Sequence, residues 1–115
     1  MNFKTTIAIQ ALLASESIIR SIDTDVFPAN INHYISANRI RDLAEQLKHQ
    51  PAPVSEAEAE NASRIVNTKL EHSHTHIQSL LDRVKVLTPK ELEANEYNLA
   101  ALEQSAQLLN TIASA

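Results

Sequence analysis

The sequence predicts an all-α protein, a small helical bundle in which an antiparallel helical hairpin of residues 55–87 and 88–113 packs with two preceding helices. Three observations lead to this fold class. The chain of 115 residues contains no glycine, the residue that turns and close backbone approaches most often require. Apolar residues recur at helical spacing in four segments. Capping-box sequences at Ser55 and Thr88 mark two helix starts.

The first helix is expected from about Phe3 to Ile22. It ends before the connector at 23–30, because Pro28 moves the residue before it out of the helical region. Its apolar face is expected to consist of Phe3, Ile7, Ala11, Ala14, Ile18 and Ile22. Ile9 and Leu13 then fall on the otherwise polar back of this helix.

The second helix is expected to begin at Asn30, a residue type that caps helix N-termini well. It ends near Gln50, because the prolines of the connector at 50–54 stop a helix. Its predicted apolar face comprises Ile31, Tyr34, Ile35, Ala37, Ile40, Leu43, Ala44 and Leu47.

The hairpin is predicted from two apolar seams. The first keeps a strict four-three spacing through Val66, Leu70, Ser73, Ile77, Leu80, Val84 and Leu87. The second runs through Leu92, Asn95, Leu99, Leu102, Ala106, Leu109 and Ala113. A turn as short as the one at Thr88 and Pro89 requires two such helices to fold back antiparallel. We expect residues 1–115 to form a single helical domain.

Composition excludes several classes of protein. Without glycine, the chain has no phosphate-binding P-loop, no dinucleotide-binding fingerprint and no nucleophile elbow. Without cysteine, it has no disulfide and no thiol nucleophile, and this fits a cytoplasmic protein. No apolar run is long enough to span a membrane. The net charge of −4, with the acidic excess in residues 51–115, argues against nucleic-acid binding.

A second apolar stripe is the main candidate for a functional surface. Tyr97, Leu108 and Ile112 lie about 120° around the last helix from its seam. With Ile9 and Leu13, they either fill space between helices of one bundle or contact another chain. The sequence leaves both readings open. We expect that these residues contact another chain, which is either a different protein or a second copy of this chain in a homodimer.

His72, His74 and His76 form the one conspicuous histidine cluster. On a helix only His72 and His76 share a face, and we expect this face to point to solvent. Two histidines without a third ligand make a weak metal site at best. The expectation is therefore no cofactor and no metal, with these two residues as the only candidates.

The sequence shows no arrangement of catalytic residues, so we expect no enzyme. The first functional hypothesis is a non-enzymatic interaction protein: an adaptor, an inhibitor of a larger complex or an assembly subunit. The alternative is a small-ligand binder with a pocket between helices or at a dimer interface, lined by polar seam residues such as Ser73 and Asn95. The third is a weak binder of metal or nucleic acid.

Overall fold

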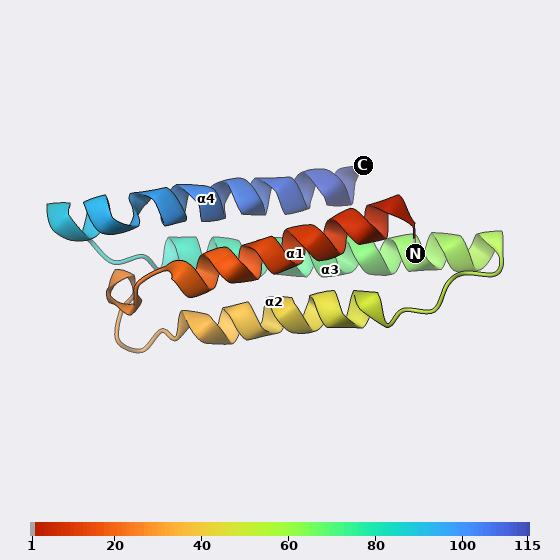
Figure 1. Ribbon diagram of the computed structural model, residues 1–115, viewed down its shortest axis with the longest axis horizontal. Coiled ribbons are helices and arrows are strands. Elements are labelled where there is room, and N and C mark those ends of the chain that lie inside the picture. Colours follow the sequence, from red (N-terminus) through yellow and green to blue (C-terminus); the bar gives the residue numbers. More distant parts are fainter. Residues whose placement is uncertain (1) are drawn as a thin grey trace.

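A computed structural model describes residues 2–115 and confirms the all-α prediction (Figure 1). Successive helices run in opposite directions, and no strand occurs in this part of the chain. The bundle is a rod of 54 × 23 × 17 Å. Its elements are α1 (Phe3–Ser21), the 3₁₀ helix η1 (Thr24–Val26), α2 (His33–Lys48), α3 (Glu56–Asp82) and α4 (Pro89–Ser114).

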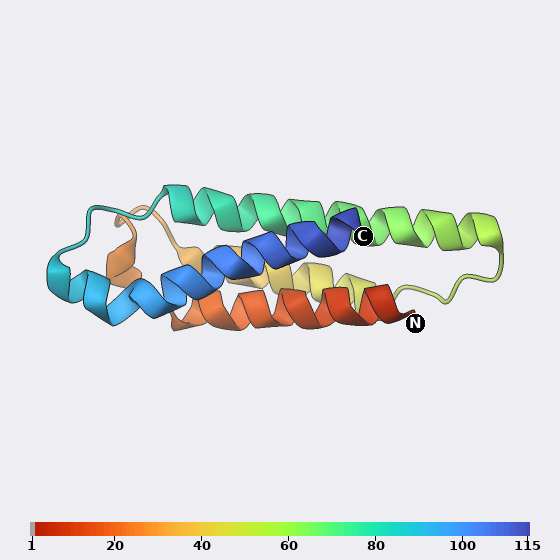
Figure 2. The same cartoon turned by 90° about the horizontal axis from the view of Figure 1, so that it is seen from above.

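The helices are staggered rather than level. α1 lies between α2 and α4 in Figure 1 and packs most extensively against α2, while the most extensive contacts of α3 are with α4. α4 crosses the bundle obliquely in Figure 2. Its first turns project at one end of the rod, and the first turns of α3 project at the other. The contact between α2 and α3 is much less extensive than these pairings.

The buried face of α1 differs from the predicted one. Phe3 and Ala14 are exposed, whereas Ile9 is buried in the core. The prediction was wrong because α1 contacts all three other helices, so its buried surface is broader than one apolar stripe. The residues it buries are Thr5, Ala8, Ile9, Ala11, Leu12, Ser15, Glu16 and Ile19.

Helix α2 starts two residues later than predicted. Its N-cap is Asn32, whose side chain accepts a hydrogen bond from the Tyr34 amide, and not Asn30. A backbone bond from the Ile31 amide to the Pro28 carbonyl closes a turn before it. The predicted apolar face is wrong only in the first turn, where His33 is fully buried and Tyr34 and Ile35 are exposed. It is confirmed further along the helix by the buried residues Ala37, Ile40, Ala44 and Leu47.

The seam of α3 is confirmed over five positions, because Val66, Leu70, Ser73, Ile77 and Leu80 are all buried. The predicted end of this helix is wrong.

Helix α3 stops at Asp82 rather than near Leu87. The Lys85 amide leaves the helical pattern and donates to the Val26 carbonyl of η1. If α3 continued, the Lys85 amide would bond within the helix and could not donate to Val26. Val84 and Leu87 still pack against the core, but from an extended connector at 83–88.

The start of α4 is confirmed. Thr88 and Glu91 form a complete capping box, in which each side chain accepts a hydrogen bond from the other residue's amide. Pro89 occupies the first turn, where its missing amide hydrogen costs nothing. At Ser55 the box is only half formed, because Glu58 accepts from Val54 instead.

Candidate functional site

The five residues predicted as a contact surface fall into two groups. Tyr97 is 82% exposed and Leu108 is 49% exposed, both on the outer side of α4. Ile9 and Ile112 are 6% and 8% exposed and belong to the core of this chain. Leu13 is half-buried and packs against that core. Of these five residues, only Tyr97 and Leu108 present substantial apolar surface to solvent.

Tyr97 and Leu108 lie on one face of α4, because their separation of eleven residues is about three helical turns. Between them on the same face are Ala101, which is half-buried, and Gln104, which is exposed. We call Tyr97, Ala101, Gln104 and Leu108 the α4 outer strip. It carries no charge.

His72 and His76 border a hollow between α2 and α3, together with Arg39, Asp42 and Gln46 of α2. The expectation that both face open solvent is therefore wrong for His76, which is partly buried. Its pKa is lowered by burial first, then by the positive charge of Arg39, then by His72. No group of three metal-ligating side chains is present within residues 2–115, so the histidine pair lacks a third ligand there.

His74 has a different role from its neighbours. Its Nδ1 lies 2.9 Å from the Ala106 carbonyl oxygen, so the ring joins α3 to α4. This contact places it on the hairpin side of α3, at the edge of the buried seam.

The seam residues suggested as pocket lining are instead part of the packed interior. Asn95 donates to the Glu91 carbonyl and accepts from the Asp23 amide, which fixes the connector after α1. Ser73 is fully buried, and its hydroxyl has no hydrogen-bond partner. Open hollows occur elsewhere, along α2, α3 and the connector between them.

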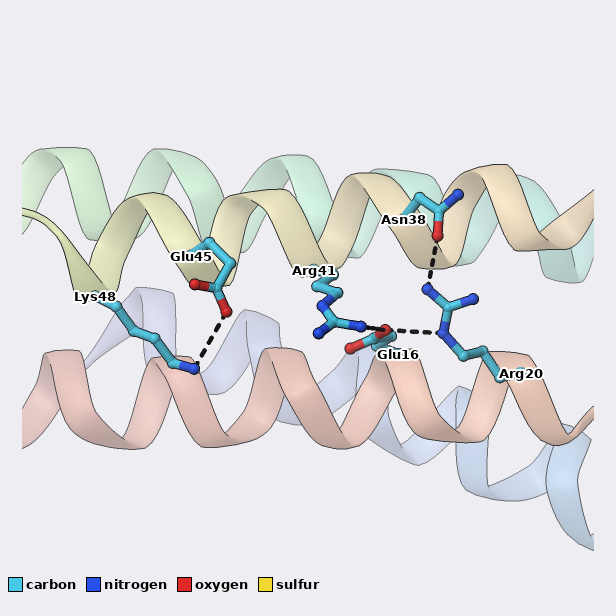
Figure 3. Close-up of polar contacts among 6 residues, drawn as sticks. All are labelled: Glu16, Arg20, Asn38, Arg41, Glu45 and Lys48. Carbon is cyan, nitrogen blue, oxygen red and sulfur yellow. Dashed lines mark hydrogen bonds and ion pairs between the residues drawn. The ribbon is translucent and has the colours of Figure 1, made fainter.

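A buried ion pair on the opposite side of α2 was not anticipated from the sequence. Figure 3 shows Glu16 of α1 between Arg20 and Arg41. Arg20 Nε lies 2.8 Å and Arg41 Nη1 3.7 Å from Glu16 Oε2. Arg20 also donates to Asn38 of α2 over 2.6 Å (Figure 3). The Glu16 carboxylate is thereby committed to joining α1 and α2, and this leaves it a structural role.

A second polar group missed by sequence reasoning is His33. It is fully buried, with Nε2 2.8 Å from the Ile22 carbonyl oxygen, and its Nδ1 has no partner. The rings of Phe27 and Tyr34 lie beside it, at centroid distances of 5.1 and 4.4 Å. Its position explains how the 22–32 connector is held against α2. The sequence does hold a signal for its burial, because His33 precedes Ala37 and Ile40 at the four-three spacing of a buried helix face.

No helix within residues 2–115 combines the length and apolar character needed to cross a bilayer. Comparison of the chain with protein-family models gives no match, and comparisons with curated proteins and with solved structures give none either.

Proposed function

We propose that this chain is a non-enzymatic assembly subunit that binds a second copy of itself through the α4 outer strip. The observation that supports the proposal is Tyr97, which is 82% exposed in the interior of a long helix. Other strongly exposed apolar residues, such as Phe3, Val54 and Val86, lie at a helix end or in connectors. Tyrosine is among the residues that contribute most to protein interfaces.

The strip is self-complementary under a two-fold axis. If two α4 helices pack antiparallel with the axis midway along the strip, Tyr97 lies opposite Leu108 of the second copy. Ala101 then lies opposite Gln104, and the small alanine permits close approach. In this register Glu93, at the edge of the strip, lies level with position 112 of the second copy, where α4 carries no carboxylate side chain.

The small core of the chain also favours self-association, because association would bury additional apolar surface. The chain is short and has only two tyrosines, two phenylalanines and no tryptophan, so its core is built from small and aliphatic side chains. A single-helix interface lies at the small end of specific interfaces, so we expect a reversible dimer whose fraction rises with concentration. An adaptor or inhibitor would use the same strip for a different partner. Self-complementarity favours a second copy.

The test compares charge insertion on the strip with the same insertion beside it. In the double variant Tyr97→Glu/Leu108→Glu, association would bury two carboxylates without partners, which is strongly unfavourable. The matched control is Gln107→Glu/Asn110→Glu, at exposed positions of α4 outside the strip. Sedimentation equilibrium should show a monomer for the strip variant and a dimer for the parent and the control.

Helicity measured on the same samples separates loss of contact from loss of fold. We expect full helicity in the strip variant, because both positions are exposed in the monomer. Ile112→Glu provides the contrast: it places a carboxylate in the core and should unfold the bundle. A parent that remains monomeric at all concentrations would refute self-association, and so would a strip variant that still dimerises.

A further inference from the structure

The hollow between the start of α2 and the end of α3 carries a chemistry that the proposed function does not use. Its volume is about 300 Å³. Arg39 reaches it from α2 and Arg83 from the position directly after α3, and His76 lies on its wall. Ser36 and Ser79 contribute one hydroxyl from each helix. We call this hollow the α2–α3 pocket.

The positive charge of this pocket is uncompensated. None of its lining residues is acidic, and within residues 2–115 neither Arg39 nor Arg83 forms an ion pair. The arginines on the other side of α2 behave differently, because Arg20 and Arg41 are both engaged by Glu16. Arg39 and Arg83 are both exposed, so an anion that enters the hollow can approach two guanidinium groups that no carboxylate of residues 2–115 already engages.

The state of His76 reports the same positive environment. Burial, Arg39 and His72 all lower the pKa of His76 and so favour its neutral form. The charged and titratable groups that line the hollows beside His76 are Arg39 and Asp42 of α2, His72 of α3, and Arg83 directly after α3. Asp42 lines only the adjoining hollow and not the α2–α3 pocket. An anion bound in the pocket would supply the negative charge that this side of His76 lacks.

We propose that the α2–α3 pocket binds a phosphomonoester, with the phosphate held between Arg39 and Arg83. Guanidinium groups match phosphate oxygens in a bidentate manner, and Ser36 and Ser79 supply further hydroxyl donors. Most of the lining is polar, and Asn30 and Asn32 add to it. The apolar wall consists of Ile31, Ile35 and Leu80, and the apolar part of the ligand lies against these three side chains.

An isolated small ligand fits this site better than a nucleic acid does. A nucleic acid needs a continuous track of cations along its backbone. Here Asp42 lines the hollow next to the pocket, and α3 begins with the exposed carboxylates of Glu56, Glu58 and Glu60, so acidic side chains interrupt the cations along α2 and α3. None of the lining residues of the pocket belongs to α4, so the proposal does not depend on self-association through the α4 outer strip.

The experiment uses phenyl phosphate, a phosphomonoester with an apolar body, and follows the His76 ring by NMR. At pH 7.5 the probe is mostly a dianion, because the second pKa of such phosphates is about 6. We expect saturable binding and an upward shift of the His76 pKa, since a nearby dianion stabilises the imidazolium form. Arg39→Gln and Arg83→Gln should each weaken binding by about tenfold or more. The matched control is Arg64→Gln, which removes the same charge from α3 outside the pocket and should leave the affinity nearly unchanged.

Each other outcome contradicts a defined part of the proposal. Absence of saturable binding would overturn it, and so would equal losses in the Arg39, Arg83 and Arg64 variants, which would indicate general screening of charge. Inorganic phosphate that binds as tightly as phenyl phosphate would refute the role of the apolar wall. A single-stranded oligonucleotide that binds more tightly, with a steep dependence on salt, would replace the small ligand by a nucleic acid.

Discussion

The ion pair that joins α1 to α2 gives the sharpest prediction about stability. Glu16 interacts with two arginines that differ in distance and exposure. Arg20 Nε lies 2.8 Å from its carboxylate and the Arg20 side chain is 34% exposed, whereas Arg41 lies 3.7 Å away and is 60% exposed. A double-mutant cycle for each pair isolates the two interactions.

The structure sets the magnitudes. A hydrogen bond to a charged group contributes about 1.5–3 kcal/mol when it is shielded from water, and an exposed ion pair contributes about 0.2–1 kcal/mol. Because Glu16 is buried and Arg20 is partly exposed, we expect a coupling free energy of about 1–2 kcal/mol between them. For Glu16 and Arg41 we expect less than about 0.5 kcal/mol.

The assay is urea unfolding followed by circular dichroism for Glu16→Gln, Arg20→Gln, Arg41→Gln and the two double variants. Glutamine retains the size of Glu16 and removes only its charge. Arg20 keeps its bond to Asn38 in the Glu16 variant, so the guanidinium stays in place. Two results would refute the reasoning: a coupling with Arg41 as large as that with Arg20, or a coupling with Arg20 no larger than the roughly 0.3–0.5 kcal/mol of an exposed pair one helical turn apart.

Three further predictions concern the hairpin and the histidines. Leu102→Ala should reduce the free energy of unfolding by about 2–5 kcal/mol, because Leu102 is fully buried. Leu108→Ala on the outer strip should reduce it by less than about 1 kcal/mol. Equal losses of stability in urea unfolding would contradict the assignment of these two residues to different faces of α4. The pKa of Glu91 is lowered by the Thr88 amide first and then by Lys85, so its contribution to stability is present above about pH 5 and is lost as pH falls through the lowered pKa. Thermal unfolding of Glu91→Gln and the parent should therefore differ at neutral pH and converge in acid, and a difference that persists in acid would exclude this ionisation as the cause. Dialysis against EDTA should leave the melting temperature unchanged, because His72 and His76 have no third ligand within residues 2–115; stoichiometric zinc retained after dialysis would contradict this.

The parts of the fold that could be predicted are those that depend on interactions between residues within one or two helical turns of each other. The seam of α3 and the cap at Thr88 depend on local spacing and on local hydrogen bonds, and both are confirmed. The end of α3 at Asp82 depends instead on the bond between Lys85 and Val26, two residues far apart in the sequence. No pattern within residues 55–88 reveals this hydrogen bond to Val26, so the prediction extended the helix too far.

The candidate surfaces show the same division. A helical wheel identifies apolar stripes, but it cannot say whether a neighbouring helix covers them. Ile112 and Leu108 have the same character in the sequence, yet the core buries one while the other faces outward, because α1 and α3 reach only one side of α4. The α2–α3 pocket was missed for a related reason. Arg39 and Arg83 are forty-four positions apart, and only the packing of α2 beside α3 brings them to one hollow.

The layout of the bundle keeps the two proposed surfaces apart. α2 and α4 lie on opposite sides of α1 (Figure 1), and they share no extensive contact. The pocket lies where α2 meets α3, a contact much less extensive than that of α1 with α2 or of α3 with α4, which leaves room for a ligand. The outer strip lies on the side of α4 that no other helix covers. Two helices connect them: α1 packs against both α2 and α4, and α3, which forms one side of the pocket, packs against α4. A ligand in the pocket could affect self-association only by moving α1 or α3, and the close packing of α1 against α2 opposes such movement.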